Sequence, residues 1–161
     1  NKIGEFVLGS DGSKFDNLII KNGGGSNSHN HEAPLNEYGT DNFYTDNDLY
    51  MNGVEIFNFT IQLVPKLITD TLEKNDLDLV DIDYFIFHQA NSFMLNYLRK
   101  KLNIPENKFY NDLKDTGNTV SSTIPIALKK CFEKKIICSN VNIMLVGFGV
   151  GLSWGATIIK L

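Results

Sequence analysis

Two short runs of mostly apolar residues place the tightest constraint on the fold. They cover Tyr84–Phe87 and Asn142–Val146, and neither alternates between apolar and polar residues. Unbroken apolar runs of this length are typical of strands that are buried inside a sheet. A last strand is predicted at Ser153–Ile159, after a break at Gly147–Gly151. A chain with such strands needs helices that cover its sheet.

Three segments have the pattern of helices. Apolar residues recur every three or four positions in Val54–Leu72, where Pro65 is expected to kink or divide the helix. Asn91 is expected to cap a second helix that reaches Leu102, and a third is predicted at Ser121–Lys134. Because these helices alternate with strands, the fold class predicted is α/β, a layered domain with a mixed β-sheet covered by helices.

The first third of the chain is less regular. Gly4–Leu8 and Asn17–Lys21 have the composition of strands, and the turn-forming residues between them predict a β-hairpin. Residues 22–49 contain three consecutive glycines and many polar residues without an apolar period, so we expect a long loop. All 161 residues are treated as one domain.

The bulk composition excludes several functions. A net charge of −4 is unfavourable for binding nucleic acid or an anionic membrane surface, which require clustered Lys and Arg. No apolar run is long enough to cross a membrane. The two cysteines, Cys131 and Cys138, do not suggest a disulfide framework, so a cytoplasmic location is expected. The sequence opens in a strand-like run without methionine, from which we expect a fragment of a longer protein.

Three features are candidates for chemistry. His88 directly follows the predicted strand Tyr84–Phe87, and ligands of layered α/β folds bind beyond the carboxyl ends of strands. Asn118 lies in a polar turn, and glycines alternate with larger residues in Gly147–Gly151, where the backbone can approach a ligand closely. Taken one at a time, each feature also has a purely structural explanation.

Together these features resemble a known family. The motifs are His88-Gln89-Ala90-Asn91, Gly117-Asn118-Thr119 and the glycine-rich segment Phe148–Gly155, and His88 and Asn118 lie 30 positions apart. The stretch Met51–Phe57 adds a fourth match. In order and spacing they resemble the carboxyl-terminal half of β-ketoacyl-acyl carrier protein synthase III, a condensing enzyme of the thiolase superfamily. The likeness runs from Gly4 to Leu161 and is weakest in residues 22–49.

The resemblance implies a thiolase-like half-domain and an acyltransferase of fatty acid biosynthesis. Enzymes of this family join an acyl-coenzyme A primer to malonyl-acyl carrier protein with loss of carbon dioxide, in a decarboxylative Claisen condensation. They use these substrates without a further cofactor. The nucleophilic cysteine belongs to the amino-terminal half, which is absent here, so the isolated chain is expected to be inactive. The implied partners are that half, acyl carrier protein and a second copy in a homodimer.

The resemblance also assigns roles to residues. His88 and Asn118 would donate hydrogen bonds to the thioester oxygen of the malonyl group, and His88 would be neutral with its outward nitrogen protonated. The backbone N–H of Val150, where many relatives have glycine, would stabilise the tetrahedral species on the cysteine. The positions that match the lining of the pantetheine channel, and so would bind substrate, are Gly53, Phe57, Ala90 and Asn91.

The sequence departs from the family at a few points. Phe93 replaces a residue that is often basic in the family and is linked to coenzyme A and carrier-protein contact. Lys100 and Lys101 could supply charge toward an acidic carrier protein. Cys131 and Cys138 do not precede a glycine-rich helix start, so both are predicted to be structural.

A metal site is not predicted. His29, His31 and Glu32 lie close together in the long loop, but zinc requires a fourth ligand or a rigid scaffold.

Two other functions stay open. One is an acyltransferase of the same fold that forms esters or amides, which Phe93 and the loop at 22–49 would suit. The other is an interaction domain that kept the fold and lost the chemistry. In the family, two similar halves pack across a large interface, so an isolated half is expected to expose an apolar face and to self-associate or bind a partner.

Overall fold

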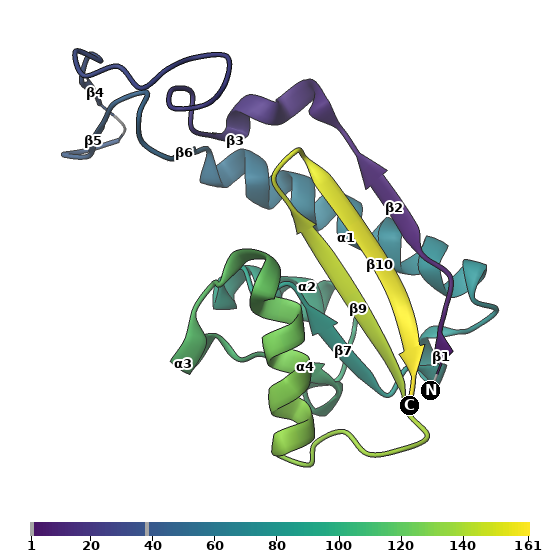
Figure 1. Cartoon of the computed structure of the whole chain (residues 1–161). Coiled ribbons are helices and arrows are strands. Elements are labelled where there is room, and N and C mark those ends of the chain that lie inside the picture. Colours follow the sequence, from purple (N-terminus) through teal and green to yellow (C-terminus); the bar gives the residue numbers. More distant parts are fainter. Residues whose placement is uncertain (1, 38) are drawn as a thin grey trace.

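The computed structural model describes residues 2–37 and 39–161 and is built around one mixed sheet (Figure 1). The strands are β1 (Lys2–Ile3), β2 (Val7–Ser10), β3 (Leu18–Ile19), β4 (Asn36–Glu37), β5 (Phe43–Tyr44), β6 (Tyr50–Met51), β7 (Tyr84–Phe87), β8 (Phe109–Tyr110), β9 (Asn142–Gly149) and β10 (Ser153–Lys160). The α-helices are α1 (Gly53–Lys74), α2 (Ser92–Lys101), α3 (Leu113–Thr116) and α4 (Thr123–Glu133). Short 3-10 turns cover Gly12–Asn17, Leu79–Asp81, Glu106–Lys108 and Val120–Ser122.

The sheet has the order β1-β10-β9-β7-β8, and β2 also pairs with β10. Strand β7 is parallel to β8 and β9, whereas β9 and β10 form an antiparallel pair. The two pairings place β7 and β9, the two strands predicted from apolar runs, side by side in the middle of the sheet. The predicted α/β layered fold with a mixed sheet is therefore confirmed.

The side chains of β9 alternate between two hydrophobic layers. Met144, Val146 and Phe148 point into the larger core, which also contains residues of α1 and α2. Ile143 and Leu145 belong to a second, smaller cluster with Ala127 of α4. Figure 1 shows the consequence, with α1 and α2 behind the sheet and α4 in front of β7. The buried strands are thus apolar on both faces because helices lie on both.

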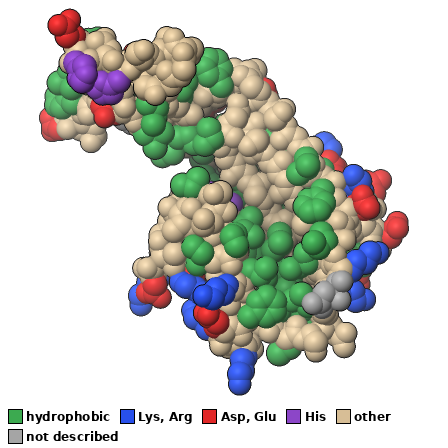
Figure 2. Space-filling model, in the orientation of Figure 1, with side chains coloured by type: hydrophobic (Ala, Val, Ile, Leu, Met, Phe, Trp, Pro, Cys, Tyr) green, Lys and Arg blue, Asp and Glu red, His purple; other side chains and the backbone are tan. Residues whose placement is uncertain are grey.

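Helix α4 covers part of the front face of β9, but within residues 2–37 and 39–161 no helix lies over the rest of that face, which β9, β10 and β2 form. Leu8 on β2 is 74% exposed and stands opposite Gly155 of β10, which in turn pairs with Gly147 of β9. Figure 2 shows apolar side chains gathered on this side of the molecule. An apolar face of this kind was expected, and the self-association predicted from it stays a prediction. We call it the open face; its exposed apolar residues include Ile3, Phe6, Leu8 and Val150.

One local prediction was wrong. Gly4–Leu8 and Asn17–Lys21 do not form a hairpin, because β2 pairs with β10 and β3 pairs with β6. Asp11 caps a 3-10 turn instead, its side chain accepting a hydrogen bond from the N–H of Ser13. Its backbone exchanges hydrogen bonds with Leu152, which directs the chain along β10 rather than back along itself.

Helix α1 is not divided at Pro65 and runs unbroken through 22 residues. Val64, Leu67 and Ile68, on either side of the proline, are buried in the core and hold both halves of the helix on the sheet. Strand β9 extends three residues beyond the predicted end, through the first glycines of the turn. Residues 22–49 are mostly irregular but contain the short pair β4–β5.

Helix α2 is held in place by its buried leucines, which gives a test of the core. Replacing the fully buried Leu98 by Ala should lower the free energy of unfolding by about 2–5 kcal/mol, because the substitution leaves a cavity. Urea denaturation measures this change. Val80→Ala, at a residue that is 81% exposed, is the control and should change the stability by no more than about 0.5 kcal/mol. Equal effects of the two substitutions would contradict the packing described.

Candidate active site

His88 is fixed at the end of the central strand. Its backbone N–H continues the parallel pairing beyond β7 by donating to the carbonyl of Val146, 2.7 Å away, and its own carbonyl accepts from the N–H of Ala90. The imidazole lies edge-on to the ring of Phe148, with centroids 5.5 Å apart, and its Nδ1 is 2.7 Å from Oγ1 of Thr123. Burial lowers the pKa of His88 below its ordinary value of 6.5, so the ring is neutral at neutral pH.

Asn118 is exposed in the turn between α3 and α4. Gly117, with φ of 67°, ends α3 and lets the chain reverse before this residue. The side-chain oxygen of Asn118 accepts a hydrogen bond from the N–H of Val120 at 2.9 Å. This contact orients the carboxamide, so that its amino group is the end left to donate to a ligand.

Val120 is held in an uncommon conformation. Its φ of 56° lies in the left-handed region, which is unfavourable for a β-branched residue and costs about 1–3 kcal/mol. Its N–H donates to Asn118, and its carbonyl accepts from the backbone N–H of Thr123. This one strained peptide segment therefore sets the orientation of Asn118 and the start of α4 together.

His88 and Asn118 line one cavity of about 1110 Å³, which lies against the open face. Gly149 and Val150 line the same cavity, from the turn that joins β9 to β10. The rest of the wall is mainly apolar and includes Leu8, Ile19, Met51, Ile124, Leu145 and Trp154. The structure thus brings together an imidazole, a carboxamide and a glycine-rich backbone segment. The roles predicted for His88, Asn118 and Val150 stay predictions.

Val150 is exposed at the tip of that turn. Its carbonyl accepts a hydrogen bond from the hydroxyl of Ser153 at 2.6 Å, which holds the tip of the turn. The side chain is 58% exposed and adds apolar surface to the mouth of the cavity.

The four predicted substrate-binding residues do not line this cavity. Gly53 is exposed at the start of α1, and Ala90 packs against the larger core. Phe57 lies against Tyr97 and Phe93, with ring centroids 5.2 Å and 5.6 Å away. The side-chain oxygen of Asn91 accepts from the N–H of Met94 at 2.8 Å, which confirms Asn91 as the cap of α2. The substrate-binding roles of these four residues stay predictions.

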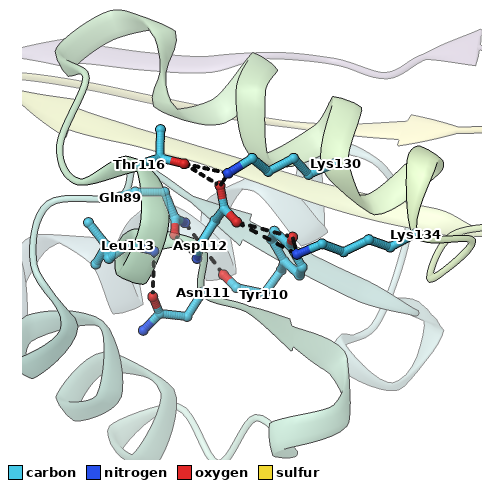
Figure 3. Close-up of polar contacts among 8 residues, drawn as sticks. All are labelled: Gln89, Tyr110, Asn111, Asp112, Leu113, Thr116, Lys130 and Lys134. Atoms are coloured by element: carbon cyan, nitrogen blue, oxygen red, sulfur yellow. Dashed lines mark hydrogen bonds and ion pairs between the residues drawn. The ribbon is translucent and has the colours of Figure 1, made fainter.

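Gln89, which follows His88, ties two site segments together. It is 2% exposed, and its Oε1 accepts from the backbone N–H of Asp112 at 2.7 Å. Its amide nitrogen donates to the carbonyls of Phe87, at 2.7 Å, and Tyr110, at 3.4 Å. Because β8 and α3 lead to Asn118, this side chain links the turn that carries His88 to the segment that carries Asn118 (Figure 3).

Asp112 is buried and joins the same segment to α4. Its Oδ2 lies 2.6 Å from Nζ of Lys130 and accepts from the hydroxyl of Thr116 at 3.0 Å, and Lys134 is 4.0 Å from the other oxygen. Burial raises the pKa of this carboxyl, but the hydrogen bonds from Lys130 and Thr116 and the charges of Lys130 and Lys134 lower the pKa more, to below 3.8. Figure 3 shows the carboxylate between the two lysines.

These contacts include residues that the sequence analysis did not single out. Gln89 stands inside the motif quoted above, which was a signal of its importance. Thr123 and Asp112 carried no such signal, since their partners come from packing of α4 and β8 against β7.

The two cysteines and the two loop histidines do not line the cavity of His88 and Asn118. Cys131 is fully buried, and burial raises the pKa of its thiol to about 12, so it stays protonated. Cys138 is exposed, and both thiols are free. The rings of His29 and His31 are 4.7 Å apart, yet residues 2–37 and 39–161 contain no group of three side chains arranged to hold a metal ion. In the same residues, no helix has the length and apolar character to span a membrane.

Solved structures share this architecture. A crystal structure of a 3-oxoacyl-(acyl-carrier-protein) synthase III superimposes with a TM-score of 0.95 at 40% identity, over 99% of this chain and 48% of that chain. The β-ketoacyl-[acyl carrier protein] synthase III of Thermus thermophilus gives a TM-score of 0.80 at 31% identity, over 99% of this chain and 46% of that chain. The fold is therefore that of the thiolase-like condensing enzymes.

The sequence relatives agree. Residues 72–161, more than half of the chain, match the family described as 3-Oxoacyl-[acyl-carrier-protein (ACP)] synthase III C terminal. The chain is 41% identical over 154 residues to the Beta-ketoacyl-[acyl-carrier-protein] synthase III of Clostridium tetani, covering 95% of this chain and 46% of that protein. The protein of the same name from Clostridium perfringens is 40% identical over 153 residues, covering 94% and 44%.

The chain belongs to the carboxyl-terminal domain family of 3-oxoacyl-[acyl-carrier-protein] synthase III. It spans about half the length of the curated relatives it matches, 44% and 46% in the two cases given.

The cap of α2 can be tested apart from any role in substrate binding. Asn91→Ala should lower the free energy of unfolding by about 1 kcal/mol, because the N–H of Met94 loses its acceptor. Asn96→Ala is the matched control, since Asn96 is an exposed residue within the same helix. Thermal or urea unfolding measures both, and a loss for Asn96→Ala as large as that for Asn91→Ala would argue against capping.

The Asp112 network gives a prediction that depends on pH. Asp112→Ala should lower the stability at neutral pH by about 1–3 kcal/mol, because Lys130, Thr116 and Lys134 lose their acceptor. The folded-state pKa of the carboxyl is depressed, so the stabilisation is present above pH 3.8 and is lost as the pH falls through the folded-state pKa.

Unfolding curves at neutral pH and below pH 3.8 should therefore show a difference between the wild type and Asp112→Ala that shrinks in acid. Asp115→Ala, which removes an exposed carboxylate from α3, the helix that Asp112 precedes, is the control. A difference that stays constant across this range would mean that the charge of Asp112 contributes nothing.

Proposed function

We propose that this chain is the carboxyl-terminal half of a condensing enzyme that joins an acyl-coenzyme A primer to malonyl-acyl carrier protein with loss of carbon dioxide. The observation that carries the proposal is the common cavity of His88 and Asn118, which is lined by a neutral imidazole and an oriented carboxamide. The substrate classes come from the family resemblance and from the names of the relatives.

The chemistry needs two neutral donors at one oxygen. When the malonyl thioester loses carbon dioxide, the electrons of the broken carbon–carbon bond pass into an enolate whose charge rests on the thioester oxygen. N–H groups of His88 and Asn118 would stabilise that charge without reorganising, an effect of about 3 kcal/mol for one such donor. A neutral His88 suits this step, because it donates a hydrogen bond and does not take up a second proton at neutral pH.

The enolate carbon then attacks the acyl thioester held on a cysteine. The resulting tetrahedral oxyanion would accept a hydrogen bond from the backbone N–H of Val150, and its collapse releases the cysteine thiolate. Cys131 is buried with a raised pKa, and Cys138 does not line the cavity, so neither suits the role of nucleophile. The cysteine is therefore assigned to the amino-terminal half, and the isolated chain would not condense acyl groups.

The proposed partners follow from the same reasoning. The open face would pack against the amino-terminal half, and the complete enzyme would act as a cytoplasmic homodimer that receives acyl carrier protein. Lys100, on α2, is one of the exposed basic residues that would face the acidic carrier protein. The pantetheine arm would pass Gly53, Phe57, Ala90 and Asn91. No cofactor beyond the two substrates, no nucleic acid and no membrane is part of the proposal.

The test uses the full-length enzyme, in which the amino-terminal half precedes this chain. His88→Ala and Asn118→Ala should each lower kcat for condensation by about 10²–10³-fold, because each removes one donor from the enolate oxygen. Formation of the acyl-enzyme from acyl-coenzyme A should continue, since it needs the cysteine and not these donors. His31→Ala, in the exposed loop, is the control. Unchanged condensation in both site variants would overturn the proposal.

A second candidate function is transfer of the acyl group to an alcohol or an amine. Phe93 favours it, because a 73% exposed aromatic side chain stands where relatives often have a basic residue. Product analysis with malonyl-acyl carrier protein, compared with alcohol and amine acceptors, separates the two reactions. Ester or amide products without a β-ketoacyl product would select this second function, and no product from any acceptor would favour a domain that only binds.

A further inference from the structure

Among the residues described, Thr123 is the one whose side chain makes a polar contact with the His88 ring. It is the first residue of α4 and is 3% exposed, and its Oγ1 lies 2.7 Å from Nδ1 of the imidazole. The edge-to-face contact with the ring of Phe148 restricts the imidazole further. The ring is therefore held with Nδ1 toward α4.

The other ring nitrogen, Nε2, is the one that reaches the cavity. Two side-chain polar atoms in the described part of the chain are buried without a partner, Nε of Arg99 and Oγ1 of Thr119. Since Nε2 of His88 is not one of them and makes no hydrogen bond to a described residue, it is accessible. His88 lines the cavity, so Nε2 is the atom available to a bound ligand.

The hydroxyl hydrogen of Thr123 has two possible acceptors. One is Nδ1 of His88 at 2.7 Å, and the other is the carbonyl of Val120 at 3.1 Å. A hydroxyl donor prefers a separation of about 2.7–2.8 Å, which fits the first and is exceeded by the second. The carbonyl of Val120 also already accepts the backbone N–H of Thr123. Both observations favour donation to Nδ1.

We propose that the Thr123 hydroxyl donates to Nδ1 of His88 and thereby holds the ring proton on Nε2, so that His88 presents an N–H to the cavity. In the opposite tautomer, Nδ1 would donate to Thr123 and a bare lone pair on Nε2 would face the ligand. Such a lone pair repels an oxyanion, whereas an N–H stabilises it. Thr123 is therefore a positioning residue that acts through His88, and its importance for condensation rests on the proposed function.

The tautomer can be observed directly. The chain contains three histidines, so the imidazole nitrogen-15 spectrum of the labelled 161-residue protein has few signals, and His88→Gln identifies those of His88. At neutral pH we expect Nε2 to be protonated and Nδ1 to have the shift of an unprotonated acceptor. A wild-type spectrum in which Nδ1 carries the proton overturns the assignment, and this measurement needs neither a variant of Thr123 nor any enzymatic activity.

Two variants test whether the hydroxyl is the cause. Thr123→Val keeps the shape but removes the donor, and we expect the His88 signals to shift toward a mixture of the two tautomers. Thr123→Ser keeps the hydroxyl and should retain the wild-type pattern. Retention of the wild-type pattern in a folded Thr123→Val would mean that another group sets the tautomer.

In the full-length enzyme, Thr123→Val should lower kcat for condensation by about 10- to 100-fold, as for groups that orient metal-binding histidines, and leave KM nearly unchanged. Thr123→Ser should restore most of kcat. Thr69→Val, which makes the same change at an exposed hydroxyl of α1, should leave the kinetics as they are. A shifted tautomer with unaltered condensation would count against the proposed function, while the Nδ1-protonated wild type would count against this inference alone.

Discussion

The parallel pairing of β7 with β9 determines where the candidate chemistry lies. Backbone hydrogen bonds between these strands continue one residue past β7, where the N–H of His88 donates to the carbonyl of Val146. The imidazole is thus attached to the most buried part of the sheet, where Phe87 and Val146 are fully buried. A side chain at the end of such a strand has little freedom to move. The same strand β9 continues into the turn with Val150, so one pair of strands brings both His88 and Val150 to the lining of the cavity.

The second requirement is that a separate segment brings Asn118 to the cavity that His88 lines. Asn118 is 30 positions further along the chain and lies in a turn, which alone would leave it mobile. Three polar links remove that freedom. Gln89 binds the backbone of Asp112, Asp112 pairs with Lys130 of α4, and the strained Val120 holds the carboxamide. Buried polar groups with satisfied partners cost little and specify one arrangement, which the two donors of the proposed function would need.

The sequence predicted the central elements well, because their signals are local. The apolar run at Tyr84–Phe87 gave the strand with its observed ends, and Asn91 was identified as a helix cap. The amino-terminal hairpin failed for a physical reason. The turn-forming residues do make a tight turn, but no feature of the nearby sequence indicates that β2 pairs with β10, some 145 residues away. The contacts of Thr123 and Asp112 were equally out of reach, since they exist only once α4 packs on β7.

In the proposed function, the open face is where the missing part of the active site would join this chain. Helix α4 covers β7 and one side of β9. On the rest of that face, the paired glycines of β9 and β10 have no side chains, so they add no polar group and leave the sheet surface unobstructed. The cavity with His88 and Asn118 lies against this uncovered face, so whatever covers the face also closes the cavity. In the proposed function, a cysteine delivered from that side would carry its acyl group to the cavity in which His88 and Asn118 would donate to the malonyl thioester oxygen. Closing the cavity would also exclude water, which strengthens the hydrogen bonds from His88 and Asn118 to a developing charge. In the proposed function, assembly of the two halves would therefore also complete the environment in which His88 and Asn118 act.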